Sequence, residues 1–118
     1  MQYVIHYHET SQSHYDFMIE RKGYLETFRV GERDMQRLMG GIIVDSVKIN
    51  DHRLDYLSYE GPVSCDRGCV RLFDSGEYAE KGSSDSSFIL LLNGTVFHGL
   101  ILFLRIKGNS YSMHYDLG

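Results

Sequence analysis

Short runs of aromatic and β-branched residues, each ended by turn-forming residues, recur along the whole chain. Within several runs the side chains alternate with a period of two, which is the period of an extended strand. Turn signals such as Arg21-Lys22-Gly23 and Asn93-Gly94 join neighbouring runs closely enough for hairpins. The expected strands cover residues 2–8, 14–20, 24–30, 42–49, 69–73, 88–92, 95–106 and 111–117. Strands this short and this numerous predict an all-β fold, a small antiparallel β-barrel with at most one or two short helical turns.

The segments between these runs carry more specific signals. Asp34 is placed to cap one helical turn over residues 35–39, which the following glycine pair would stop. Residues 79–87 are small and polar and predict a flexible loop. Gly99, inside an apolar run, indicates a bulge or a sharp bend.

Size and composition fit one domain spanning residues 1–118, with 42% hydrophobic and 24% charged residues. No apolar run approaches the ~20 residues of a membrane span. A strand pattern begins at the N-terminus with no visible leader, so we expect a cytoplasmic protein with no membrane partner. We also expect a monomer. Cys65 and Cys69 are too few for a disulfide framework and are read as incidental thiols. The net charge of −4 disfavours a broad basic surface for nucleic acid, but allows a metal ion and a few cations to hold one phosphate.

Three metal-ligand residue types fall within nine positions near the N-terminus: His8, His14 and Asp16. In an extended strand His14 and Asp16 project from the same face, and a turn through residues 9–13 would bring His8 beside them. Two imidazoles and a carboxylate suit Mn²⁺, Zn²⁺ or Fe²⁺, and three protein ligands leave coordination positions open. The alternative is a strand edge that carries two surface histidines, and the spacing alone leaves both interpretations open.

A second polar cluster follows the fourth expected strand. His52 and Tyr56 are four residues apart and would share a face if residues 50–56 form a helical turn. A cationic imidazole and a phenol hydroxyl can both donate hydrogen bonds to phosphate oxygens. The cluster is therefore either a phosphate clamp or a hydrogen-bonded turn.

Two stretches together resemble the 3′-phosphoesterase domain of bacterial and archaeal DNA ligase D. The family pattern F-V-I-x-x-H, followed six residues later by H-Y-D-F-R-L-E, is similar to residues 3–8 and 14–20 here. The family's D-H-P-L-x-Y-x-x-F-E-G is similar to residues 51–61, and V-x-x-W-D-x-G is similar to residues 70–76. A closing L-x-G-x-x-x-x-G resembles residues 92–99. The resemblance keeps the same order from Tyr3 to Ile106.

The resemblance implies a compact β-barrel in which His8, His14 and Asp16 hold Mn²⁺, with Zn²⁺ or another divalent transition metal as alternatives. It also implies that His52 and Tyr56 contact the phosphate and take part in catalysis, and we add Arg53 as a candidate phosphate ligand. Members of this family trim the 3′ ends of nucleic acid and leave a hydroxyl that a polymerase or ligase can use.

The chain departs from the family pattern at several positions. Met18 stands where the family has an arginine, on the strand face of Asp16, and we expect its side chain to point into the site. Asn50 replaces a glutamate, an N-terminal arm has no counterpart, and the loop after Gly61 is shortened to residues 62–64. The candidates to replace the missing cation are Arg53, Arg29 and Arg21.

The leading hypothesis is a metal-dependent 3′-end phosphoesterase that acts on DNA or RNA primer ends in DNA repair, alone or beside a separately encoded ligase or polymerase. One alternative is a catalytically weak module that binds a metal and a nucleic-acid end. Another is a phosphodiesterase for small molecules, which the acidic net charge would suit.

Overall fold

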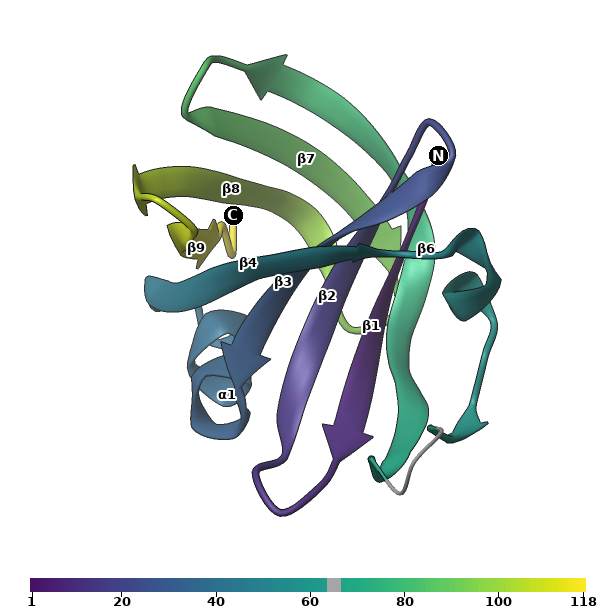
Figure 1. Cartoon of the computed structure of the whole chain (residues 1–118). Coiled ribbons are helices and arrows are strands. Elements are labelled where there is room, and N and C mark those ends of the chain that lie inside the picture. The colour runs from purple at the N-terminus through teal and green to yellow at the C-terminus, as the bar shows by residue number, and fades with distance from the viewer. Residues whose placement is uncertain (64–66) are drawn as a thin grey trace.

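The computed structural model describes residues 1–63 and 67–118 (Figure 1). Cys65 lies outside the described residues, so its predicted role as an incidental thiol is not addressed. The elements in chain order are β1 (Gln2–Glu9), β2 (His14–Arg21), β3 (Tyr24–Gly31), α1 (Glu32–Met39), β4 (Val44–His52), the 3₁₀ turn η1 (Leu54–Leu57), β5 (Gly61–Pro62), β6 (Cys69–Ser83), β7 (Ser87–Gly94), β8 (His98–Lys107) and β9 (Ser110–Tyr115).

Eight of the nine strands close into an antiparallel barrel. The order around the ring is β1-β2-β3-β4-β9-β8-β7-β6, and β6 returns to pair with β1. Within the ring, the long β6 pairs with β1 along its first part and with β7 along its last part. β5 pairs with the start of β6 and lies outside the ring. The predicted antiparallel barrel is confirmed, and α1 and η1 are the helical elements of the described residues.

Alternation along each strand separates a packed interior from an outer face. In β2, Phe17 points into the main core whereas Asp16 points outward. The ring of Phe103 packs against those of Phe17 and Phe28, with centroids 5.5 Å and 4.8 Å away. Burying each such ring stabilises the fold by about 1.5–3 kcal/mol. A one-residue slip of β2 would turn Phe17 outward and Asp16 inward, so core packing also fixes which side chains face outward.

Helix α1 begins three residues earlier than the predicted helical turn. Its N-cap is Gly31, which is extended and makes no side-chain cap, so the prediction that Asp34 caps the helix is wrong. Met35 and Leu38 are fully buried in the main core, and this packing stabilises the helix without a cap. The glycine pair ends the helix as predicted, with Gly41 at φ +83°.

The predicted loop over residues 79–87 is wrong, because strand β6 continues to residue 83 and β7 begins at residue 87. Two features hide this strand in the sequence. Its two parts pair with different neighbours, and a bulge between Glu80 and Gly82 interrupts the register with β7. Tyr78, just before the predicted loop, donates its hydroxyl hydrogen to the carbonyl of Glu20 and thereby joins β6 to β2.

The chain reversal between β7 and β8 is held by one buried carboxylate, Asp74 of β6. It accepts the backbone N–H groups of Thr95, Val96 and Phe97, each at 3.0 Å. It also accepts the hydroxyl hydrogen of Tyr3 at 2.5 Å. Four donors therefore satisfy this carboxylate, which explains how it is tolerated at 5% exposure.

The reversal lies later than the Asn93-Gly94 signal predicted. Asn93 pairs with His98 inside the ladder, so the turn consists of residues 95–97. Gly94 is required for a different reason, because a Cβ there would lie 1.8 Å from the hydroxyl oxygen of Tyr3. The β7–β8 register runs through Gly99 without a shift, so the predicted bulge is absent from this ladder.

Strand β4 runs to His52, three residues beyond the prediction, and the following segment crosses the outer face of the barrel (Figure 1). A second, smaller apolar cluster lies under this crossing and consists of Val4, Met18 and Leu25, covered by Leu54, Tyr56 and Leu57. Among the described residues, no helix is both long and apolar enough to cross a membrane.

Candidate functional site

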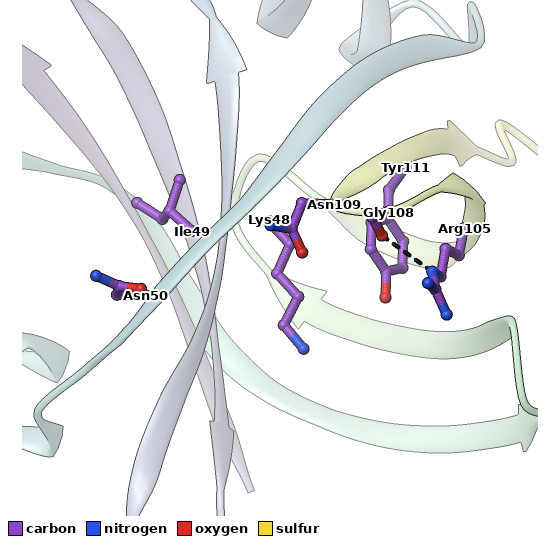
Figure 2. A pocket seen from close by; sticks show the side chains of 7 residues that line it. All are labelled: Lys48, Ile49, Asn50, Arg105, Gly108, Asn109 and Tyr111. Carbon is purple, nitrogen blue, oxygen red and sulfur yellow. Dashed lines mark hydrogen bonds between the residues drawn. The ribbon is translucent and has the colours of Figure 1, made fainter.

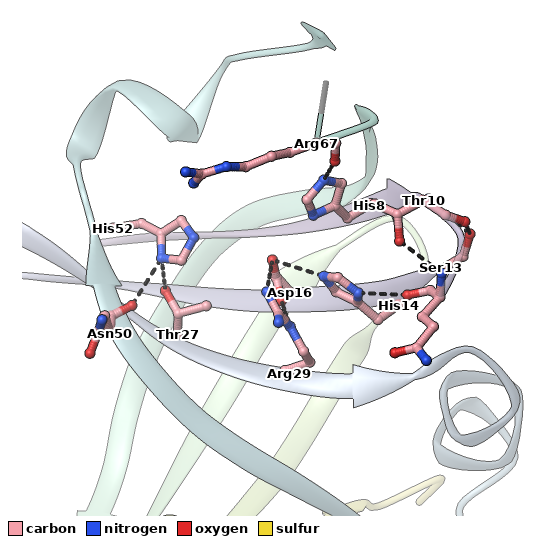
Figure 3. A network of polar contacts seen from close by, with 11 residues as sticks. His8, Thr10, Ser13, His14, Asp16, Thr27, Arg29, Asn50, His52 and Arg67 are labelled. Carbon is pink, nitrogen blue, oxygen red and sulfur yellow. Dashed lines mark hydrogen bonds and ion pairs between the residues drawn. The ribbon is translucent and has the colours of Figure 1, made fainter. Parts of the chain in front are cut away.

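The first hairpin brings together the three predicted metal ligands. His8 and His14 are directly paired across β1 and β2, next to the turn that joins these strands. Asp16, two residues further along β2, projects from the same outer face (Figure 3). One ligand atom from each of the three side chains lies within 4.8 Å of the others. The strand pairing therefore produces the cluster that the spacing predicted, and metal binding by it stays a prediction.

The ring of His14 is oriented by the backbone of the turn. Its Nδ1 lies 3.1 Å from the carbonyl oxygen of Gln12, so Nδ1 carries the hydrogen and donates it. Nε2 is then left with a lone pair, buried and without a hydrogen-bond partner among the described residues. It lies 3.6 Å from Oδ2 of Asp16. A buried lone pair beside a carboxylate fits a bound cation.

His8 is held in a similar way from the opposite side of the site. Its Nε2 lies 2.7 Å from the carbonyl oxygen of Arg67 and donates to it, which leaves the lone pair on Nδ1. Histidines that bind a metal commonly donate their other N–H to a backbone carbonyl, which fixes the tautomer and the ring orientation. Both histidines of the cluster follow this pattern.

Asp16 is ionised despite its burial. Its side chain is 4% exposed, and its Oδ1 accepts a hydrogen bond from Nε of Arg29 at 3.1 Å. Burial alone would raise the pKa of this carboxyl, but the hydrogen bond and the positive charge of Arg29 oppose burial, and the pKa lies below its usual range. The cluster thus offers a permanent negative charge together with two imidazole lone pairs.

His52 is positioned by residues of β3 and β4. Its Nδ1 lies 3.0 Å from the carbonyl oxygen of Asn50 and 3.1 Å from Oγ1 of Thr27. The hydroxyl of Thr27 donates to Leu25, so both neighbours present lone pairs and Nδ1 carries the hydrogen. Nε2 is the nitrogen left to act on a ligand. The ring of Tyr56 stands edge-on to His52 with centroids 5.6 Å apart. The two residues do not share the helical turn predicted over residues 50–56, because His52 ends β4 and Tyr56 lies in η1.

A cavity of about 610 Å³ joins the metal-ligand cluster to this histidine–tyrosine pair. Its walls are His8, Thr10, Ser11, His14, Asp16, Arg29, His52, Tyr56, Val63, Arg67 and Gly68. Of the three arginines proposed from the sequence, only Arg29 lines this cavity. Arg53 lines a neighbouring cavity, and Arg21 is paired with Glu26 and Glu80 elsewhere.

Sequence reasoning missed two residues of the site. Arg67, which lies just before β6, extends over the cavity (Figure 3), and the local sequence around it gives no sign of this position. His6 lines a smaller chamber of about 60 Å³ shared with Asp16 and Tyr56. It is 2% exposed, its Nε2 has no partner among the described residues, and burial lowers its pKa. The alternation His6-x-His8 was the signal that could have identified it.

The structure corrects the expectation for Met18. Its side chain does lie on the outer face of β2, but it is fully buried in the cluster beneath η1. The lining of the cavity does not include it. Leu54 and Leu57 pack over it, which the strand period alone cannot reveal.

Another cavity, of about 650 Å³, lies between β4 and the β8–β9 turn (Figure 2). Its two cations have partners within the chain. Lys48 pairs with Glu26 at 2.8 Å, and Nε of Arg105 donates to the carbonyl of Gly108 at 2.9 Å. None of its lining residues belongs to the metal-ligand cluster, so we assign the functional site to the first hairpin.

Fold and site together define a small closed β-barrel domain with a histidine–carboxylate cluster and a histidine–tyrosine pair on its outer face. The model of the DNA Ligase D 3′-phosphoesterase domain family matches residues 6–117, and the chain belongs to this family.

Relatives with this domain include much longer proteins. The chain is 31% identical over 121 residues to the multifunctional non-homologous end joining protein LigD of Mycobacterium bovis, a match that covers 95% of this chain and 15% of the relative. It is 26% identical over 126 residues to the protein of the same name from Mycolicibacterium smegmatis, with 95% and 16% covered. The chain thus spans about 15% of the length of these relatives.

Proposed function

We propose that this protein is a metal-dependent 3′-end phosphoesterase that processes the 3′ ends of nucleic acid during DNA repair. The observation that carries the proposal is the orientation of His8 and His14. Each donates one ring hydrogen to a backbone carbonyl, and one ligand atom of each lies within 4.8 Å of one from Asp16. Family membership and the names of the end-joining relatives support the choice of a 3′ end as substrate.

Mn²⁺ is the proposed ion, with Zn²⁺ or another divalent transition metal as alternatives, because two imidazoles and one carboxylate suit this group of metals. When bound, such an ion would supply Lewis acidity toward a phosphoryl oxygen and lower the pKa of bound water. The proposed ligands are His8, His14 and Asp16. The hydrogen bond from Arg29 keeps Asp16 ionised and in place for this role.

The remaining residues of the cavity would bind and orient the phosphate. His52 holds Nε2 free, so in its cationic form it can donate to a phosphate oxygen or protonate the leaving oxygen. Tyr56 lines the same cavity and can donate through its hydroxyl. Arg67 offers a guanidinium for a bidentate phosphate contact, whereas Arg53 lines the neighbouring cavity and is not assigned this role.

A specific observation favours the alternative of a catalytically weak module that binds a metal and a nucleic-acid end. Met18 provides no cation, and the guanidinium of Arg29 is already engaged with Asp16. Among the described residues, Arg67 is then the one lining arginine without an ion pair to the ligand cluster. Losing one transition-state donor costs on the order of 3 kcal/mol, or about 100-fold in rate.

Turnover of a 3′-phosphorylated primer with added Mn²⁺ tests the proposal, with release of phosphate and formation of a 3′-hydroxyl as the readout. The same assay includes a primer that ends in a ribonucleoside and a free nucleoside 3′-phosphate. We expect turnover of the primers, abolished in His14→Ala and retained in His98→Ala, a matched control with an exposed histidine. Primer binding without turnover would favour the weak module, and turnover of the free nucleotide alone would favour a small-molecule phosphodiesterase.

A further inference from the structure

A second cavity, of about 300 Å³, borders the main cavity of the site. The two share the walls formed by Tyr56 and Val63, so a ligand in one is adjacent to the other. Its full lining is Arg53, Asp55, Tyr56, Tyr59, Pro62 and Val63. Its volume is at the lower end of the ~300–1,000 Å³ usual for small-ligand sites.

Two tyrosine rings give this cavity a rigid aromatic wall. Tyr59 stands edge-on to Tyr56, with centroids 5.5 Å apart and an interplanar angle of 85°. The hydroxyl of Tyr59 donates to the carbonyl oxygen of Pro62, which fixes the far end of the ring. A half-buried ring held at both sides loses little conformational entropy when a flat ligand stacks on it.

The polar groups at the rim are available to a ligand. Arg53 and Asp55 are exposed, and neither side chain forms an ion pair or a hydrogen bond with the described residues. A cation and a carboxylate beside an aromatic wall suit a flat heterocycle whose edge carries both acceptors and donors. A nucleobase has these properties, whereas an inorganic phosphate or a lipid chain has no flat surface that could stack on the ring.

We infer that this cavity binds the nucleobase of the 3′-terminal nucleoside whose phosphate lies in the main cavity. The inference rests on the proposed function for the position of the phosphate. Tyr56 forms the boundary between the two parts of the ligand, because it lines both cavities. Tyr59 is the stacking residue, and Arg53 and Asp55 face the edge of the base.

Two primers and two variants test this inference. One primer carries a normal 3′-terminal nucleotide with a 3′-phosphate, and the other carries an abasic 3′-phosphate at the same position. With Mn²⁺ present, we expect kcat/KM to be about tenfold higher for the primer with the base, the gain typical of one base–aromatic stack. Tyr59→Ala should lose this tenfold preference and turn over the abasic primer at the rate of the natural protein. Tyr59→Phe keeps the ring and should keep the preference.

Tyr24→Ala is the matched control, since Tyr24 is 40% exposed at the β2–β3 turn and lines neither cavity. Equal turnover of the two primers by the natural protein would overturn the inference. So would a Tyr59→Ala variant that loses the same factor on both primers, because that result indicates a structural role.

Binding of a primer that ends in 2-aminopurine, read by its fluorescence, separates this inference from the proposed function. Base-dependent binding that Tyr59→Ala abolishes, without turnover of either primer, would reject the phosphoesterase and keep the base site. Turnover without any base dependence would reject the base site and keep the phosphoesterase. Absence of both turnover and base-dependent binding would reject the phosphoesterase and the base site together.

Discussion

The two histidines of the site owe their ring orientation to backbone carbonyls rather than to each other. The carbonyl of Gln12 belongs to the β1–β2 turn, and that of Arg67 belongs to the distant segment that leads into β6. One contact is therefore fixed by local sequence and the other by the path of the chain across the barrel. The sequence alone could identify the candidate ligand residues, but it could not show which backbone groups orient their rings.

Removing a single ligand should abolish Mn²⁺ binding while the barrel stays folded. We expect this for His14→Ala and for Asp16→Asn, because both side chains lie outside the main core. The loss in unfolding free energy should stay within about 1 kcal/mol for His14→Ala, as for most changes outside a packed core. Calorimetric titration with Mn²⁺ measures the affinity, and His98→Ala serves as the control. Unchanged affinity in both ligand variants would rule out the proposed metal site.

Substituting His52 should separate phosphate chemistry from metal binding. His52→Ala removes the proposed donor but none of the metal ligands, so Mn²⁺ affinity should match that of the natural protein. Turnover of a 3′-phosphorylated primer should fall on the order of 100-fold or more, the usual contribution of a positioned acid or base. If His52→Ala has the turnover of the natural protein, His52 has only a structural role at the end of β4.

Met18→Arg should destabilise the protein rather than improve the site. The new guanidinium would enter an apolar cluster formed with Val4 and Leu25, where no described carboxylate pairs with it. An unpaired buried charge costs on the order of 3–5 kcal/mol. Met18→Leu keeps the volume and should cost less than about 1.5 kcal/mol. Urea unfolding measures both, and an arginine variant as stable as the natural protein with raised turnover would place residue 18 in the cavity.

His52 and Tyr56 meet, but they do so between the end of β4 and η1 rather than on the predicted helical turn. Residue types at strand spacing were enough to predict that His8, His14 and Asp16 would lie together. The same spacing placed Met18 on the correct face but could not reveal that η1 covers it. Arg67 was missed because its position depends on a long-range crossing of the chain.

At the scale of single elements, the β7–β8 hairpin depends on a side chain that comes from another strand. Asp74 of β6 satisfies the three turn amides, and Tyr3 of β1 closes the arrangement. Burial and the bond to Asp74 raise the pKa of Tyr3, which keeps its hydroxyl protonated as a donor. The Asn93-Gly94 signal predicted a turn in this region, but the turn lies at residues 95–97, because this carboxylate determines where the chain reverses.

Asp74→Asn should destabilise the barrel by about 3 kcal/mol, because hydrogen bonds to a charged acceptor are each worth about 1.5–3 kcal/mol and an amide cannot accept all four. Tyr3→Phe removes one of the four donors and should cost less. Asp85→Asn, an exposed change between β6 and β7, is the control and should leave the urea midpoint unchanged. Equal stability of Asp74→Asn and the natural protein would show that the turn does not need this carboxylate.

The extent of β6 was the element least accessible from sequence. A strand that pairs with β1 along one part and β7 along another has no constant inner face, so it does not alternate cleanly. Segments with one partner on each side along their whole length, such as β2, were predicted almost to the residue.

For the molecule as a whole, closing the barrel accounts for the position of the site. The interior is filled by aromatic and aliphatic side chains, so a polar site must lie outside it. Residues 53–63 and 67–68 lie over the outer face of the first hairpin and supply Tyr56, Val63 and Arg67 as walls. The site thus unites the first hairpin with a segment about fifty residues away.

Because the proposed ligands come from both strands of the first hairpin, and the crossing segment holds His8, metal binding should stabilise the whole barrel. An ion that binds only the folded state adds about 2.7 kcal/mol of unfolding free energy at a concentration one hundred times its Kd. We therefore expect Mn²⁺ at that concentration to raise the unfolding free energy of the natural protein by that amount, seen as a higher urea midpoint, and a chelator to reverse the rise. His14→Ala should unfold at one midpoint with or without Mn²⁺, whereas His98→Ala should respond like the natural protein. A rise of equal size in His14→Ala would mean that the ion acts elsewhere on the chain and would remove the main support for the phosphoesterase proposal.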